Sequence, residues 1–350
     1  MSASSVYYQD STVTLIHANS LDALAEMPAD SVDCIVTSPP YFALRNYGLL
    51  PTHWPETSYV PMAGLPPVNI EAMACALGCE PTPQAFIAHL VLIFEHARRV
   101  LASDGTLWLN IGDSYSSRAD ASVGPISGRS RANVMPARVN TTSAVPRKNL
   151  LGIPWQLAFA LQAQGWILRN DIIWNKPNAT PESVQDRFSG RYEDIFLFSK
   201  SPRYWFDLDP IRQPHAEVSV RRAQPHRSAP GRSAREGIPY EGIAGGQTMR
   251  LDQMNHPKGR NPGDVWTIPT QPFPGAHFAA MPPRLAQQCV LAGCKPGGTV
   301  LDPFNGSGTT GLAAQRCGRR YVGVDLKDEY LKLSLTARLR DAALDFQEGA

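Results

Sequence analysis

Residues 300–310 read VLDPFNGSGTT and decide the fold. This stretch runs from a strand through a glycine loop into a helix. Gly306 and Gly308 permit backbone conformations and a close ligand approach that a side chain would obstruct, and the helix N-terminus offers free amide groups to a negative group. The loop has no lysine after its last glycine and no GxGxxG pattern, so it is neither a P-loop nor a dinucleotide fingerprint.

Two aspartates complete the pattern. Asp302 stands where the strand enters the loop, and a carboxylate there can hold a cationic amino group. Asp325 lies 23 residues later in RRYVGVDL, at the end of the next strand, and is placed to accept hydrogen bonds from ribose hydroxyls. A nucleoside attached to an amino acid satisfies both ends, which describes S-adenosylmethionine. The other interpretation is an ordinary strand-to-helix turn, with Asp325 as a helix N-cap.

Strands are predicted to alternate with helices along most of the chain. The expected strands cover residues 12–17, 32–37, 106–111, 167–174, 195–199, 299–301 and 321–324, and the expected helices cover residues 20–27, 83–101, 154–164, 283–292, 309–317 and 328–340. This alternation is typical of an α/β fold with a doubly wound, mostly parallel sheet. Residues 42–81 are rich in proline, glycine and aromatic residues, and we expect an excursion from the core there.

Ser38-Pro39-Pro40-Tyr41 follows the strand at residues 32–37. The prolines fix their own φ angles, and Pro40 biases Pro39 to an extended conformation, so the turn is rigid. Neither proline has an N–H, and the turn therefore presents acceptors beside the flat ring of Tyr41. Such a site suits an exocyclic amino group on a planar base, whose lone pair it would localise for attack on a sulfonium methyl group. The alternative is a Pro-Pro turn with a packing tyrosine.

Positive charge is concentrated in two segments. Residues 116–150 hold six basic residues and one acid, and residues 210–262 hold nine basic residues and four acids, although the whole chain carries a net charge of only +2. Basic segments set into an otherwise acidic globule predict a surface that binds a polyphosphate. Solvated loops would have the same composition.

Composition excludes several protein classes. The chain has 350 residues, of which 43% are hydrophobic and 18% charged, so disorder throughout is excluded. The longest apolar run, residues 86–94, is much shorter than the roughly 20 residues that cross a bilayer, and we expect no membrane span. The lack of a secretory signal at the N-terminus and six scattered cysteines predict a cytoplasmic protein. Cys75 and Cys79 lack a second Cys or His pair, so we expect no metal site.

The motifs resemble those of the amino-methyltransferases that modify DNA at the exocyclic nitrogen of adenine or cytosine. TSPPY is similar to the catalytic motif of that family, and DPFNGSGTT with VGVDL is similar to its cofactor-binding motifs. The motif order resembles the permuted beta group of these enzymes. Further similarity lies in GTLWLNIGDSY, GWILRNDIIWNKPN, RYEDIFLFSKSPRYWFD and NPGDVWTIPTQPFPGAHFAAMPPRL. The resemblance implies a Rossmann-like methyltransferase fold, S-adenosylmethionine as cofactor and double-stranded DNA as substrate.

The resemblance also implies roles for individual residues. The target base would be held and stacked by Ser38, Pro39, Pro40 and Tyr41. The residues implied in cofactor binding are Asn19, Asp302, Phe304, Asn305, Gly306, Ser307, Gly308, Thr309, Asp325 and His277. Asn19 stands where many members have aspartate. The basic residues expected to contact DNA are Arg221, Arg222, Arg227, Arg232 and Arg235.

Five segments are expected along the chain. The catalytic half of the core occupies residues 1–115, a basic mobile loop 116–150, the continuation of the core 151–206, a DNA-recognition insertion 207–262, and the cofactor-binding half 263–350. A companion restriction endonuclease and a second copy of the chain are further candidate partners, and we expect no membrane contact.

The residue before the two prolines bears on the target base. Family members that act on cytosine N4 mostly have serine there, and those that act on adenine N6 mostly have aspartate, so Ser38 favours cytosine. The expected reaction is site-specific methylation of a cytosine flipped out of duplex DNA, without a covalent intermediate. Adenine N6 is the first alternative. A protein glutamine methyltransferase and a DNA-binding protein that has lost catalysis are more distant ones.

Overall fold

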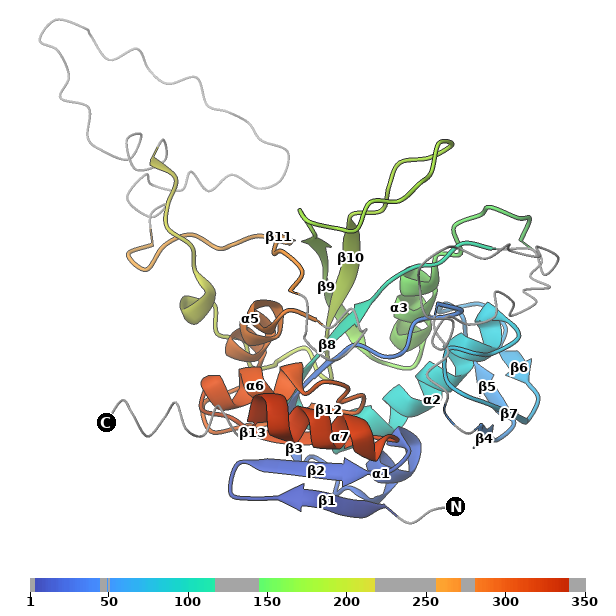
Figure 1. Cartoon of the computed structure of the whole chain (residues 1–350), viewed down its shortest axis with the longest axis horizontal. Coiled ribbons are helices and arrows are strands. Elements are labelled where there is room, and N and C mark those ends of the chain that lie inside the picture. Colours follow the sequence, from blue (N-terminus) through green and yellow to red (C-terminus); the bar gives the residue numbers. More distant parts are fainter. Residues whose placement is uncertain are drawn as a thin grey trace, which may run out of the picture. The chain divides into compact units, whose positions relative to one another are not determined.

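A computed structural model describes residues 4–44, 49, 51–116, 145–217, 256–271 and 281–339. The chain divides into two compact units, one formed by Met1–Asp207 with Asp264–Ala350 and the other by Leu208–Gly263. Among the described residues of the first unit, nine strands form one sheet (Figure 1). In sheet order they are β1 (Ser5–Gln9), β2 (Val13–His17), β13 (Arg320–Asp325), β12 (Thr299–Asp302), β3 (Val32–Thr37), β8 (Leu101–Ile111), β10 (Tyr192–Ser199), β9 (Ile167–Asn175) and β11 (Val265–Thr267).

The centre of the sheet is parallel. From β2 through β13, β12 and β3 to β8, every neighbouring pair runs in the same direction. β1 pairs antiparallel with β2, and β10 pairs antiparallel with both β8 and β9. In the described part of this unit, the helices are α1 (Ser20–Glu26), α2 (Pro83–Val100), α3 (Ile153–Ala163), α5 (Pro283–Gly293), α6 (Thr309–Arg316) and α7 (Asp328–Ser334), followed by a π-helical turn, η3 (Leu335–Leu339). The predicted α/β fold with a doubly wound, mostly parallel sheet is confirmed.

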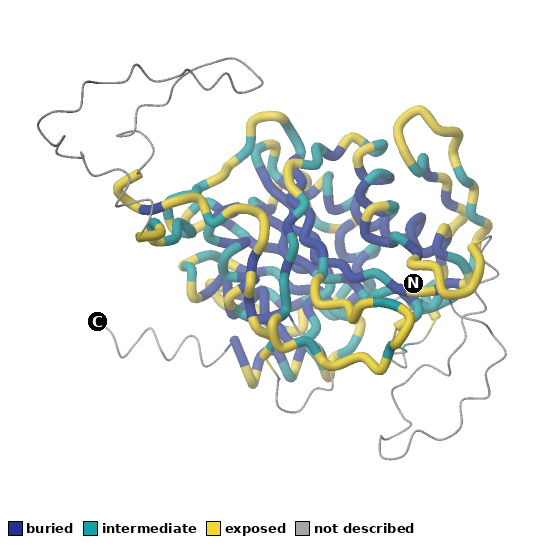
Figure 2. Tube along the Cα trace, turned by 90° about the horizontal axis from the view of Figure 1, so that it is seen from above, coloured by how far each residue is buried: buried dark blue, intermediate teal, exposed yellow. Residues whose placement is uncertain are grey.

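Helices cover both faces of this sheet. α1 contacts α2 and α2 contacts α3, whereas α5 contacts α6 and α6 contacts η3, so the helices form two layers (Figure 1). In β3 the consecutive residues Cys34, Ile35 and Val36 are all buried, which requires cover on both faces. Figure 2 shows the result as a buried interior enclosed by exposed turns.

The join between α2 and β8 differs from the sequence-based expectation. The Thr82 hydroxyl caps α2 by accepting a hydrogen bond from the Ala85 amide at 3.2 Å, and the helix ends at Val100. β8 then begins at Leu101, five residues before the expected start, because Leu101 already pairs with Val32 of β3. The register shifts after that pair. Residues at this irregularity look like a turn in the sequence, which is why the first part of the strand was not predicted.

The excursion at residues 42–81 contains two short antiparallel strand pairs. β4 (Thr52–Trp54) pairs with β7 (Met73–Cys75), and β5 (Thr57–Tyr59) pairs with β6 (Val68–Ile70). The Trp54 ring stacks on His89 of α2 with 4.1 Å between the ring centroids. The buried His89 Nδ1 lies 2.9 Å from the buried Glu80 carboxylate. These contacts fasten the excursion to the core.

The second unit is described only in part. It contains a 3₁₀ turn, η1 (Asp209–Ile211), whose Asp209 carboxylate accepts hydrogen bonds from Arg212 and Lys258, each at 2.8 Å. The five arginines expected to contact DNA lie outside the described residues, as do His277 and residues 117–144 of the expected basic loop. Of the helices that the structure describes, none is long and apolar enough to cross a membrane.

Candidate active site

The sequence-distant motifs meet at the carboxyl edge of the parallel strands. β3 ends at Thr37, directly before Ser38, and β12 ends at Asp302. The Thr37 hydroxyl donates a hydrogen bond of 2.6 Å to Asp302 Oδ1, which links the TSPPY turn to the glycine loop. Parallel strands end at the same edge of a sheet, and in open α/β sheets this edge is where ligands bind.

Asp325 organises the glycine loop. Its carboxylate accepts hydrogen bonds from the backbone amides of Gly306 at 2.8 Å and Lys327 at 2.9 Å. Burial raises the pKa of Asp325 to about 6, although both amide hydrogen bonds favour the ionised form. At neutral pH the carboxylate is ionised, and it can accept further hydrogen bonds from hydroxyl groups of a ligand.

Asp302 lies beneath the loop. It is buried, and its Oδ1 atom accepts hydrogen bonds from the Thr37 hydroxyl and from the Phe304 amide, the latter at 3.0 Å. Burial raises its pKa to about 6. These contacts give Asp302 a clear part in shaping the loop, whereas its contact with a cofactor stays a prediction.

The two loop glycines occupy left-handed backbone conformations for different reasons. Gly306 has φ of +49°, and a Cβ atom built on it would meet no atom nearer than the Phe304 carbonyl oxygen at 3.8 Å. Gly308 has φ of +75° and directly precedes α6, and a Cβ atom there would lie 2.6 Å from the Ser334 Cβ atom. Gly306 therefore faces open space, and Gly308 allows the helix to pack closely.

Asn305 supports the loop from inside the protein. The side chain is 3% exposed, donates to the Ser334 hydroxyl at 3.2 Å and accepts from the Tyr321 hydroxyl at 2.9 Å. Ser307 and Thr309 are also buried, and their hydroxyl oxygens lie 3.3 Å apart. These three side chains form contacts within the protein, and their predicted contacts with a cofactor are untested.

A pocket opens beside the loop. Its lining includes five of the predicted site residues, namely Asn19, Pro40, Phe304, Gly306 and Asp325. The tertiary fold brings the other lining residues to the pocket from α1, the excursion, α2, the loop after β12, the end of β13 and α7, and the sequence did not single them out. They are Ser20, Leu49, Thr52, Trp54, Ala76, Leu77, Ile93, Pro303, Val324, Leu326 and Tyr330. The pocket combines apolar walls with an ionised carboxylate, a combination typical of small-molecule sites.

Asn19 has a structural part in this pocket. Its side-chain oxygen accepts a hydrogen bond of 2.8 Å from the Leu21 amide and so caps α1, while its amide nitrogen donates to the Thr52 hydroxyl at 3.1 Å. Asparagine is among the residues favoured at helix N-caps. The cap fixes the direction of the Asn19 side chain at the pocket wall.

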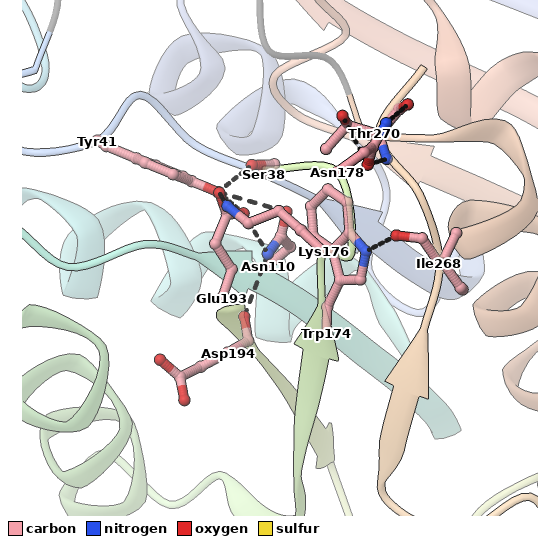
Figure 3. Close-up of polar contacts among 10 residues, drawn as sticks. All are labelled: Ser38, Tyr41, Asn110, Trp174, Lys176, Asn178, Glu193, Asp194, Ile268 and Thr270. Atoms are coloured by element: carbon pink, nitrogen blue, oxygen red, sulfur yellow. Dashed lines mark hydrogen bonds and ion pairs between the residues drawn. The ribbon is translucent and has the colours of Figure 1, made fainter. Parts of the chain in front are cut away.

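The TSPPY turn places Ser38 and Tyr41 beside each other. The Ser38 hydroxyl donates to the Tyr41 hydroxyl oxygen over 3.4 Å, and the Tyr41 hydroxyl donates to the Glu193 carboxylate at 2.7 Å (Figure 3). Gly112 lies against the ring, since a Cβ atom built there would come within 2.6 Å of Tyr41 Cε2. The ring therefore has a fixed place, and Pro40 of the same turn reaches the pocket wall.

Three polar side chains behind Tyr41 were not singled out from the sequence. They are Asn110, Lys176 and Glu193. The Asn110 side-chain amide donates a hydrogen bond of 3.1 Å to the Glu193 carboxylate, and Lys176 forms an ion pair with the same carboxylate at 2.8 Å. They come from β8, β10 and the residue after β9. A signal was present, because Asn110 and Glu193 interrupt or border strongly apolar strands, where a polar side chain needs a partner.

The carboxyl group of Asp194, the next residue along β10, lies near Asp171 and Asp113 and not in the group around Tyr41. Successive residues of a strand point to opposite faces, and the Asp194 carboxyl group points away from Glu193 (Figure 3). Burial raises its pKa to about 7, and the nearby carboxylates of Asp171 and Asp113 add to that effect.

A mixed cluster of polar side chains lies between the excursion and α2. Atoms of Cys75, Glu80 and His89 come within 4.8 Å of one another. Both carboxylate oxygens of Glu80 are engaged within the protein, one with His89 and the other with the Gly78 amide at 2.8 Å. The expectation that Cys75 and Cys79 bind no metal stays a prediction.

Comparison with known proteins places this geometry in context. The family model for DNA methylases matches residues 32–336. The type II methyltransferase M.Cfr9I of Citrobacter freundii is 38% identical over 322 residues, which are 92% of this chain and 86% of that protein. The type II methyltransferase M.XycI of Xanthomonas campestris pv. cyanopsidis is 40% identical over 321 residues, with 92% and 86% covered. The solved structure of the PvuII DNA methyltransferase (cytosine-N4-specific) aligns with 98% of this chain and 94% of that chain at a TM-score of 0.56 and 16% identity, a likeness of fold.

Proposed function

Because this chain belongs to the DNA methylase family, we propose that it transfers the methyl group of S-adenosylmethionine to the N4 amino group of a cytosine flipped out of duplex DNA. One observation carries the proposal. Pro40 of the TSPPY turn lines the same pocket as Gly306 and Asp325 of the glycine-loop half. A methyl donor held in that pocket therefore lies next to the groups that would hold the target amine.

The pocket fits this cofactor. The Asp325 carboxylate can accept hydrogen bonds from ribose hydroxyls, and the open space beside Gly306 leaves room for a ligand close to the backbone. Phe304 and Trp54 provide aromatic surface in the wall, and Asn19 provides a polar group for the adenine. When bound, the cofactor supplies an electrophilic methyl group on a sulfonium centre.

The amino-acid part of the cofactor is assigned to the glycine loop. Asp302 supplies negative charge close to the loop, and the first residues of α6 supply backbone amides that attract a carboxylate. Residues 307–309 form this stretch, with Asn305 beneath it as a support. His277, predicted to close the pocket, lies outside the described residues and stays part of the proposal.

The TSPPY turn is assigned to the target base. The Ser38 oxygen and the Pro39 carbonyl accept hydrogen bonds from the exocyclic amine, which draws its lone pair out of conjugation with the ring. The Tyr41 ring stacks on the flipped base. Pro40 keeps the turn rigid and connects it to the wall of the cofactor pocket.

Cysteine chemistry is not required for this reaction. Burial raises the pKa of all six thiols: Cys34, Cys75, Cys79, Cys289, Cys294 and Cys317. Protonated thiols are poor nucleophiles. This supports direct transfer from the cofactor to the amine, without a covalent link between the enzyme and the base.

Cytosine N4 is preferred over adenine N6 because Ser38, and not aspartate, precedes the two prolines. The PvuII enzyme, whose fold is similar, is described as cytosine-N4-specific, which is a further reason for this choice. Adenine N6 stays the alternative, since both amines are conjugated and suit the same acceptors.

DNA recognition is assigned to the segment 207–262, with Arg221, Arg222, Arg227, Arg232 and Arg235 as its phosphate or base contacts. The segment 116–150 is assigned to a second basic contact. The relatives are type II methyltransferases, and a companion restriction endonuclease is proposed on that ground, with a second copy of the chain as the other candidate partner.

Purified protein, unmethylated duplex DNA and labelled S-adenosylmethionine test the proposal, with the digested nucleosides identified by mass spectrometry. We expect N4-methylcytosine as the product. Ser38→Ala should lower kcat at least about tenfold while leaving cofactor affinity within about twofold, because it removes an acceptor used in the transition state. Asp325→Asn should weaken cofactor binding about tenfold. Methylation of adenine would overturn the base assignment, and full activity of Ser38→Ala would overturn the role of the turn.

A further inference from the structure

The polar groups behind the TSPPY turn converge on one carboxylate. Glu193 Oε2 accepts from the Tyr41 hydroxyl at 2.7 Å and from Asn110 Nδ2 at 3.1 Å, and Glu193 Oε1 accepts from Lys176 Nζ at 2.8 Å (Figure 3). The side chains of Glu193 and Lys176 are 15% and 17% exposed. The sheet register creates this meeting point, because Glu193 pairs with Trp174, two residues before Lys176.

We propose that Glu193 is a positioning residue for the target base, acting through the Tyr41 hydroxyl. A carboxylate paired with a lysine accepts hydrogen bonds and cannot donate them, and Asn110 Oδ1, 3.3 Å from the Tyr41 hydroxyl, is a second and more distant acceptor, so the Tyr41 hydroxyl is fixed as a donor. The Tyr41 oxygen is then left as an acceptor for the Ser38 hydroxyl, over the 3.4 Å between them. The Ser38 lone pairs are thereby free to accept a hydrogen bond from an exocyclic amine, the direction of bonding that the proposed function needs.

The same contact holds the Tyr41 ring in one plane. The ring is packed against Gly112 at its edge and tied through its hydroxyl to Glu193, so rotation about the Cβ–Cγ bond is restricted at two points. A base stacked on this ring would be oriented before reaction, and orientation of reacting groups changes kcat more than it changes binding. Lys176 supports the arrangement by balancing the charge of the poorly exposed carboxylate.

This inference rests on the proposed function and has a distinct test. The variants are Glu193→Gln, Tyr41→Phe and the double variant, with Glu182→Gln as the matched control. Glu182 also forms an ion pair, with Arg187 at 2.7 Å, on an exposed segment. Each protein is assayed for cofactor affinity, unfolding midpoint, and kcat and KM for unmethylated duplex DNA that contains the target site.

Glu193→Gln and Tyr41→Phe are each expected to lower kcat about tenfold with KM for DNA and cofactor affinity within about twofold of wild type. The kcat of the double variant should be no lower than that of the less active single variant, because both changes break the same connection. Glu182→Gln should behave as wild type.

Wild-type kcat in Tyr41→Phe would overturn the inference, and so would losses that multiply in the double variant. Tyr41→Phe retains the Glu193–Lys176 ion pair, so it gives this answer even where Glu193→Gln fails to fold. Absence of methyl transfer by the wild-type protein in the same assay would instead contradict the proposed function.

Discussion

Replacing the two loop glycines by alanine should separate stability from cofactor binding. Both residues have positive φ, which costs an alanine about 1 kcal/mol after the gain from a less flexible unfolded chain. At Gly306 the new methyl group meets no atom within 3.4 Å. At Gly308 it meets the Ser334 Cβ atom at 2.6 Å and the Ser334 Cα atom at 3.3 Å, both in α7, so the helix must move.

The expected free energies of unfolding follow from these distances. Gly306→Ala should lower stability by about 1 kcal/mol, and Gly308→Ala by about 2–4 kcal/mol, because overpacking adds about 1–3 kcal/mol to the backbone cost. Cofactor affinity should fall more in Gly306→Ala than in Gly308→Ala, the opposite of the order for stability. The alanine methyl at position 306 enters the pocket, which Gly306 lines, and should weaken binding about tenfold in the folded protein.

Denaturant unfolding and calorimetric titration with S-adenosylmethionine measure both quantities. Gly297 provides the matched control, since it has φ of +70° and open space but precedes β12 at the end of the strand remote from the loop. Gly297→Ala should lose about as much stability as Gly306→Ala and no affinity. Equal losses of stability at Gly306 and Gly308, or unchanged affinity in Gly306→Ala, would refute the reasoning.

Three further outcomes are expected. Gly112→Ala should displace the Tyr41 ring, whose Cε2 atom would lie 2.6 Å from the new Cβ atom, and lower kcat about tenfold while a binding titration shows unchanged cofactor affinity. Cofactor affinity should fall about tenfold between pH 7 and pH 5, since burial raises the pKa of Asp325 to about 6 and its carboxylate is a stronger acceptor of ligand hydrogen bonds when ionised; a flat profile would contradict its role. Burial raises the pKa of Asp194 to about 7, so the folded protein binds the Asp194 proton more tightly than the unfolded chain does, and stability should fall as the pH rises from about 4 to 7. Asp194→Asn should remove that slope and raise the free energy of unfolding at pH 8 by about 2 kcal/mol, as measured by denaturant unfolding.

The sequence predicts the elements of the core from local patterns, and it misses strands that have no buried face or that depend on tertiary contacts. The strands at the centre of the sheet are apolar and β-branched on both faces, which is the pattern of a parallel strand between two helix layers. β1 was not predicted, because as an edge strand it leaves Val6 61% exposed and has no buried face to give a pattern. The short strands at Trp54 and Tyr59 depend on burial of those rings against α2, a tertiary effect.

The candidate site also has a part that the sequence predicts and a part that depends on the tertiary fold. The TSPPY turn and the glycine loop carry their chemistry within a few consecutive residues, so the sequence predicts them. Glu193 and Lys176 act through a partner more than 100 residues away, and their link to Tyr41 depends on the register of β8, β10 and β9. Without that register, Glu193 reads as an ordinary polar residue at the start of a strand.

Methylation of genomic DNA in a host without its own DNA methylation tests the central claim most directly. The host would express the wild-type chain or the Ser38→Ala variant, and its DNA would be examined by nucleoside mass spectrometry and base-resolution sequencing. We expect N4-methylcytosine at one short recurring motif with the wild-type chain and strongly reduced methylation with the variant. Unmodified DNA from cells that contain folded, S-adenosylmethionine-binding wild-type protein would contradict the account.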